Sequence, residues 1–191
     1  MDTQRTTREV MEVLGHDCER CHAELVAIMN AGEVDVEGNV SADYEYHARQ
    51  LVRAIFAYIE GVTFSVKAWS AWKCLIGGVG ITPEERYLAV DTEYELNDRG
   101  EVVEAVAKIS LARNVRFAIA LNRKAHGVSV PFDASVAWWA YFKDAIRIRD
   151  RLTHPKLPGD LDVSGEELVK ALRAKAGFEE ELLQHGEAKH A

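Results

Sequence analysis

Three residues in the last third of the chain, Arg149, Asp150 and His154, have side chains that could take part in catalysis together. They lie within residues 141–156, where five basic residues outnumber two acidic ones. Arginine binds anions and histidine exchanges protons near neutral pH. This basic island is the one stretch of the sequence whose residue types indicate chemistry.

A helix should carry these residues. We expect Asp133 to cap its start and His154 to end it, because Pro155 disfavours helical geometry at the residue before it. Asp150 and His154 are four residues apart, so their side chains could meet. The apolar residues of this helix recur at intervals of three and four, which places them on one face: Trp138, Tyr141, Ala145, Ile148 and Leu152.

The string Arg149-Asp150-x-x-x-His154 resembles the signature of the HEPN superfamily of helical domains. That signature is an Arg, usually followed by Asn, Asp or His, with a His four to six residues beyond the Arg. The flanking Arg-Asp-Arg-Leu-Thr-His-Pro-Lys is similar to a form common in bacterial HEPN-like proteins. In catalytic members the Arg and the His belong to a metal-independent ribonuclease site, normally assembled across a dimer.

The resemblance implies an RNA endonuclease of a toxin or defence kind, which cuts single-stranded RNA without metal or cofactor and could have an antitoxin as partner. His154 would act as general base or acid on the 2′-hydroxyl or the leaving oxygen. Arg149 would hold the scissile phosphate, and Asp150 would orient the histidine. Three further cations would bind the strand: Arg147, Arg151 and Lys156.

The spacing of Arg149 and His154 raises a geometric difficulty. Five residues correspond to about 140° around an ideal helix, so the two side chains do not share a face. Either His154 leaves the helix or a second copy completes the site, and we therefore expect a homodimer with the motif helices near its two-fold axis.

The alternative is a non-catalytic HEPN-like binding or dimerisation module. In it, Arg149 pairs with an acid from the longest helix and His154 only ends its own helix. An open, electropositive cleft at Arg149 and His154 would favour the enzyme, whereas a pair sealed under other side chains would favour the module.

Composition is consistent with one globular domain over residues 1–191, frayed from about residue 185. The net charge of −8, from 23 basic and 31 acidic residues, argues against indiscriminate nucleic-acid binding and confines any RNA contact to the basic island. No apolar run approaches the ~20 residues of a membrane span. Three cysteines suit a reducing compartment. We predict a cytoplasmic protein without membrane contact.

Apolar periodicity predicts an all-α, HEPN-like, up-and-down bundle of four or five main helices with a small inserted β-hairpin. The expected helices cover about 6–30, 42–76, a short segment after Thr82, 111–125, the motif helix and a last helix capped by Ser164. The hairpin spans about 94–103. The longest helix carries a seam expected to lie in the core: Leu51, Ile55, Tyr58, Val62, Val66, Trp69, Trp72 and Ile76.

Two other patterns suggest function less directly. Cys18-Glu-Arg-Cys21-His22 matches the attachment string of c-type haem, and its side chains could also hold zinc. Both cysteines lie on the apolar stripe of the first helix and lack further ligands, so we predict buried thiols without metal. The polar side of helix 111–125 is either a solvated face or a positive rim of the motif: Arg113, Arg116, Arg123 and Lys124.

Overall fold

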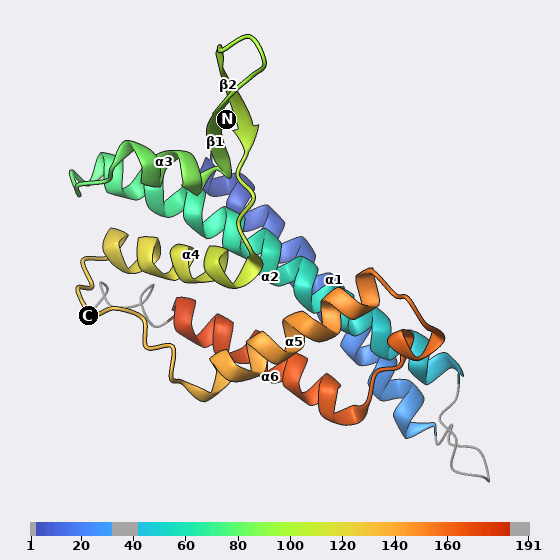
Figure 1. The fold of residues 1–191 in the computed structure, drawn as a ribbon. Helices are drawn as coiled ribbons and strands as arrows, with labels where there is room; N and C mark the ends of the chain where they lie inside the picture. The colour runs from blue at the N-terminus through green and yellow to red at the C-terminus, as the bar shows by residue number, and fades with distance from the viewer. Residues whose placement is uncertain (1–2, 32–41, 184–191) are drawn as a thin grey trace, which may run out of the picture. The chain divides into compact units, whose positions relative to one another are not determined.

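The computed structural model describes residues 3–31 and 42–183 (Figure 1). These residues form a mostly helical protein with one small antiparallel hairpin, as predicted. The elements are α1 (Thr3–Asn30), α2 (Ala42–Ile76), α3 (Pro83–Ala89), β1 (Thr92–Leu96), β2 (Val102–Val106), α4 (Leu111–Ala125), α5 (Ala137–Thr153), the 3₁₀ turn η1 (Pro158–Leu161) and α6 (Gly165–Leu183). None of the described helices combines the length and the apolar character needed to cross a membrane. The tail expected to fray lies outside the described residues.

Capping contacts explain several helix ends. Glu85 donates its N–H to Thr82 Oγ1 at 3.2 Å, and Thr82 donates its N–H to the Glu85 carboxylate at 2.9 Å, which together form a capping box for α3. Ser164 and Glu167 form a second box at the start of α6. Helix α2 ends before Gly78, whose φ of 67° is a left-handed conformation that glycine adopts at little cost.

The motif helix α5 begins at Ala137, so the prediction that Asp133 caps it is wrong. Val136 stands at the N-cap with φ −59° and ψ 142°, so the chain is still extended just before Ala137 and the helix does not reach back to Asp133. The other end agrees with the sequence, since Thr153 is the last helical residue and His154 is the C-cap.

The described residues fall into two compact units. One contains the described parts of Val10–Glu60 together with Ala134–Glu180, and therefore the whole basic island. The other contains Gly61–Asp133 with the described parts of Met1–Glu9 and Glu181–Ala191. Helix α2 contributes residues to both units. The single domain expected over residues 1–191 stays a prediction.

Aromatic side chains fill the core of the unit that carries α5. Phe56 of α2 stacks on Phe142 of α5 with ring centroids 6.3 Å apart. Gly177 of α6 approaches Trp138 of α5 so closely that a Cβ at residue 177 would lie 2.2 Å from Trp138 Cγ. The largest fully buried apolar side chains of this unit are Leu25, Leu51, Val52, Ile55, Phe56, Ile59, Phe142, Leu152 and Phe178.

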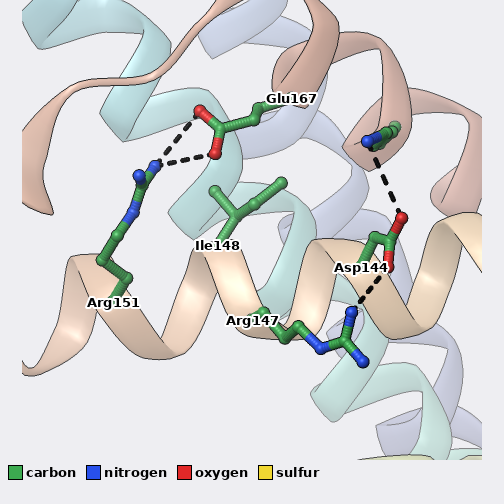
Figure 2. A pocket seen from close by; sticks show the side chains of 6 residues that line it. Asp144, Arg147, Ile148, Arg151 and Glu167 are labelled. Carbon is green, nitrogen blue, oxygen red and sulfur yellow. Dashed lines mark hydrogen bonds and ion pairs between the residues drawn. The ribbon is translucent and has the colours of Figure 1, made fainter.

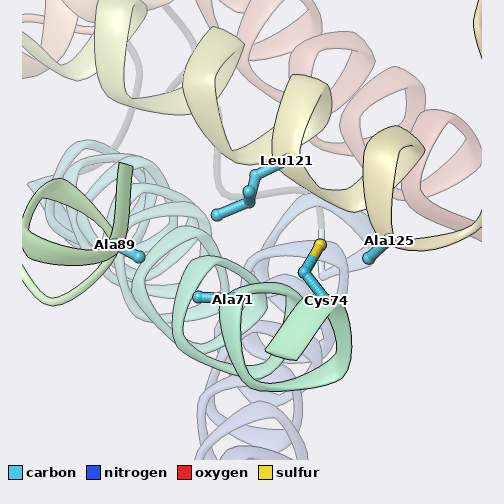
Figure 3. Close-up of a cluster of buried hydrophobic side chains, with 5 residues drawn as sticks. All are labelled: Ala71, Cys74, Ala89, Leu121 and Ala125. Atoms are coloured by element: carbon cyan, nitrogen blue, oxygen red, sulfur yellow. The ribbon is translucent and has the colours of Figure 1, made fainter. Parts of the chain in front are cut away.

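In the other unit, α2 buries small side chains. Figure 3 shows the cluster, which joins α2 to α3 and α4: Ala71, Cys74, Ala89, Leu121 and Ala125. Trp72 and Ile76 are exposed, so the predicted seam is wrong at its C-terminal end, although it is buried from Leu51 to Val62. Small residues of α2, such as Ala71 and Cys74, let the neighbouring helices come close, whereas the large Trp72 and Ile76 lie on other faces of α2.

Lys67 lies on the buried side of the same part of α2 and is fully buried. Its ammonium group forms an ion pair with Asp91 and donates to the Leu88 carbonyl at 3.3 Å. Burial lowers the pKa of Lys67, and the Asp91 carboxylate opposes that shift. Nearby, Ser70 Oγ donates to Asn122 Oδ1 at 3.4 Å. Polar pairs thus replace apolar contacts along this part of the helix.

The hairpin pairs Thr92 with Val106 and Leu96 with Val102, as an antiparallel ribbon (Figure 1). The hairpin packs little against the helices, because most of its side chains are exposed. Tyr94 meets Tyr87 of α3 edge to face, with ring centroids 4.9 Å apart.

Candidate functional site

The Arg149 guanidinium is held by two carboxylates. Nη2 forms an ion pair with Glu60 of α2, and Nη1 donates to Asp150 Oδ1 at 3.0 Å. The Arg149 side chain is 31% exposed, so it is partly desolvated but still reaches solvent. Glu60 belongs to α2, the longest helix. The non-catalytic alternative expects Arg149 to pair with an acid of that helix.

His154 lies where α5 stops. Its backbone N–H donates to the Asp150 carbonyl at 3.0 Å, and its φ of −126° and ψ of 58° turn the chain out of the helix. The imidazole is exposed, and it makes no hydrogen bond or ion pair with any described residue. It is therefore free to contact a ligand from solvent.

Asp150 does not orient the histidine in this structure. Its side chain is 55% exposed and its carboxylate accepts from Arg149, and among the described residues no hydrogen bond or ion pair joins the side chains of Asp150 and His154. The expected meeting of these two side chains is thus replaced by a pairing between sequence neighbours.

Two arginines of α2 hold the end of α5 and the segment after it. Arg53 Nη2 donates to the Leu152 carbonyl and Arg49 Nη1 donates to the Leu161 carbonyl, each at 3.3 Å. A cation at a helix C-terminus is favourable because the last carbonyls carry partial negative charge. Sequence reasoning did not single out Arg49, Arg53 or Glu60, although their spacing of four and seven residues places them near one face of a helix.

A hollow of about 350 Å³ lies between α5 and α6 (Figure 2). Its lining is Asp144, Arg147, Ile148, Arg151, Glu167 and Lys170. Arg151 donates to both oxygens of Glu167, at 3.0 and 3.1 Å, and to the Asp162 carbonyl at 2.7 Å. Arg147 is largely exposed and donates to Asp144 at 3.0 Å.

The expected site residues therefore fall into separate groups. Arg147 and Arg151 line the hollow beside α6, whereas Arg149 pairs with α2. Lys156 is exposed, and its backbone N–H donates to Asp160 Oδ2 at 2.7 Å. This bond and a similar one from the next residue lower the pKa of Asp160. The loop after the motif is thus ordered by Asp160.

The cysteines of the haem-like string differ in environment. Cys18 is buried, as predicted, and burial raises the pKa of its thiol to about 11. Cys21 is only half-buried, and burial raises its pKa too. Across residues 3–31 and 42–183, no group of three or more His, Cys, Asp or Glu side chains could hold a metal ion.

On α4, the cations of the polar side are partly neutralised. Arg123 pairs with Glu181 at 2.6 Å and Lys124 with Glu85 at 2.7 Å. Arg113 and Arg116 are exposed. This face belongs to the other compact unit.

The chain matches no protein-family model, no curated protein and no solved structure in the comparisons. These comparisons neither support nor contradict the HEPN resemblance of Arg149-Asp150-x-x-x-His154. Function is therefore inferred from the side chains of the site itself.

Proposed function

We propose that the protein is a HEPN-like, metal-independent endonuclease of single-stranded RNA, with its active site at the end of α5. One observation carries this proposal: Arg149 and His154 both reach solvent at the end of one helix. The guanidinium is positioned by Glu60, and the imidazole is uncommitted within the described chain. A cation and a proton-transfer group are what cleavage at a 2′-hydroxyl needs.

In the proposed reaction, one histidine removes the proton of the 2′-hydroxyl, and the 2′-oxygen forms a bond to phosphorus. The bond from phosphorus to the 5′-oxygen breaks, and a second acid returns a proton to that oxygen. The products are a 2′,3′-cyclic phosphate and a 5′-hydroxyl. In a homodimer, His154 of each copy supplies one of the two proton transfers, and light scattering should find a dimer at micromolar concentration.

Phosphate has to compete for Arg149, because two carboxylates already bind its guanidinium. Asp150 is more exposed than Glu60, and it directly follows Arg149 in the chain. We propose that Glu60 positions Arg149, and that the scissile phosphate displaces the Asp150 carboxylate from the guanidinium.

The test is cleavage of single-stranded RNA in the presence of a chelator, with detection of the cyclic phosphate end. DNA of the same sequence should survive because it lacks the attacking hydroxyl. His154→Ala and Arg149→Ala should each lower the rate by about 100-fold or more. His22→Ala and Arg113→Ala, at exposed residues of other helices, should cleave as the wild type does.

The ion pair of Arg149 with Glu60 specifically favours a second function, a non-catalytic HEPN-like binding or dimerisation module. Both side chains are about a third or more exposed, so the pair should contribute no more than ~1 kcal/mol to stability. If no RNA is cut and Arg149→Ala lowers stability as much as Glu60→Ala does, the pair is structural and the module replaces the enzyme.

A further inference from the structure

A second hollow, of about 440 Å³, lies between α1 and α2. This volume falls in the range of about 300–1,000 Å³ that small-molecule sites occupy. Small and apolar side chains such as Leu14, Ala54 and Ala57 line it together with several polar groups. All of its lining residues belong to the unit that carries α5.

Arg53 connects this hollow to the candidate active site. Its side chain lines the hollow, and its Nη2 donates to the carbonyl of Leu152, two residues before His154. A nucleotide chain with its scissile phosphate at the end of α5 would therefore place a neighbouring nucleotide near the hollow.

Tyr46 offers a flat surface at the hollow. Its side chain is 50% exposed, and its ring meets His47 edge to face with ring centroids 5.1 Å apart. This contact steadies the tyrosine while leaving much of it open to solvent. Unpaired bases bind proteins by stacking on such aromatic rings.

Polar groups beside Tyr46 could read the edge of a base. The Glu24 carboxylate accepts from Arg20 Nε at 3.0 Å and lies 3.6 Å from His47 Nδ1, and all three residues line the hollow. The half-buried Gln50 amide also lines it, and makes no hydrogen bond with any described residue. The hollow thus combines a carboxylate acceptor with amide and guanidinium donors.

Guanine matches this set of groups. It is the RNA base with two neighbouring N–H donors on its Watson–Crick edge, at N1 and N2, and a carboxylate can accept both at once. The adjoining O6 accepts from an amide or a guanidinium, as Gln50 or Arg20 would supply. Adenine, with an acceptor at N1, would leave the carboxylate facing a lone pair.

We propose that the hollow between α1 and α2 binds a guanine base of single-stranded RNA next to the scissile phosphate. Tyr46 stacks on the base, Glu24 and Gln50 hydrogen-bond its edge, and Arg53 contacts the connecting phosphate. The inference rests on the proposed ribonuclease function and adds a base preference to it.

Binding of free mononucleotides tests the site without requiring cleavage. By calorimetry, 5′-GMP should bind the wild-type chain about tenfold or more tightly than 5′-AMP. Tyr46→Ala should weaken GMP binding by about 10- to 100-fold. Glu24→Gln should abolish the preference for GMP. Tyr94→Ala, at a tyrosine with the same exposed fraction of 50%, and Glu19→Gln, at an exposed glutamate outside the hollow, should bind as the wild type does.

The results separate this inference from the ribonuclease proposal. If His154→Ala keeps the preference for GMP, the guanine site stands even where no RNA is cut, and only the ribonuclease is lost. If the wild type cuts RNA but binds GMP and AMP equally or not at all, the guanine site is overturned while the ribonuclease stands. Equal effects of Tyr46→Ala and Tyr94→Ala would also overturn it.

Discussion

Replacing Gly177 with alanine should destabilise the protein, although alanine is the better helix former by about 1 kcal/mol. The added Cβ would lie 2.2 Å from Cγ, 2.3 Å from Cβ and 2.8 Å from Cδ2 of Trp138. Carbon atoms in contact normally stay about 3.5–4.0 Å apart, so the two helices must separate by roughly 1 Å or more. Because the clash is with the root of the indole, a change of side-chain rotamer does not relieve it easily. Such overpacking costs about 1–3 kcal/mol, and we expect a net loss in that range.

Urea unfolding followed by circular dichroism measures this loss. Gly15→Ala is the matched control, since its Cβ would meet only Tyr58 Cε2 at 3.6 Å, an ordinary contact. It should raise the free energy of unfolding by about 0.5–1 kcal/mol. In a Trp138→Gly background, which removes Cβ, Cγ and Cδ2 of residue 138, Gly177→Ala should no longer destabilise. A Gly177→Ala protein as stable as the wild type would refute the close approach of α5 and α6.

Three further predictions concern burial, pH and the site. Ile55→Ala should lower the free energy of unfolding by about 2–5 kcal/mol because Ile55 is fully buried. Trp72→Ala, at an exposed residue, should lower it by less than about 0.5 kcal/mol. Equal losses of stability in urea unfolding would mean that the other face of α2 lies in the core. The thiol pKa of Cys18 is about 11 in the folded state against an ordinary 9.0, so the unfolded state loses this proton first. The stability that the protonated thiol contributes is present below pH 9 and is lost as the pH rises towards 11. Over this window the melting temperature of Cys18→Ala should fall less than that of the wild type. Parallel plots of melting temperature against pH for the two proteins would contradict the raised pKa of Cys18. Asp150→Asn should strengthen RNA binding by about 2- to 5-fold, measured by fluorescence anisotropy, because a competing carboxylate of Arg149 is removed; weaker binding would show that Asp150 helps to hold the strand.

Local sequence signals predicted the helices well. Helices α2 and α4 have the expected bounds, because a strong apolar period leads in each case to a glycine that ends the helix. The cap predicted at Ser164 is present as a capping box with Glu167, and Thr82 forms a second box with Glu85. The prediction for the start of α5 was wrong, because an aspartate before an apolar period is only a local signal and the chain is still extended at Val136.

Contacts between distant residues could not be read in the same way. The buried ammonium group of Lys67 pairs with Asp91, which is 24 residues away, and the sequence around the lysine does not predict such a partner. The acid that pairs with Arg149 was expected on the longest helix, but Glu60 could not be chosen among its acids without knowing how α2 meets α5. The hollow beside Tyr46 was missed because its groups come from two helices and form no sequence motif.

Each arginine in the last turns of α5 already has a carboxylate partner, and this affects how the protein would respond to ionic strength. Arg147 pairs with Asp144, Arg149 with Glu60 and Asp150, and Arg151 with Glu167. Free cationic patches bind nucleic acid largely through the release of condensed counterions, which makes affinity fall steeply with salt. Arginines that exchange one carboxylate for one phosphate release fewer such ions. A strand bound at the end of α5 would then be selected by how well its phosphate fits, and its affinity would change little between low and moderate salt.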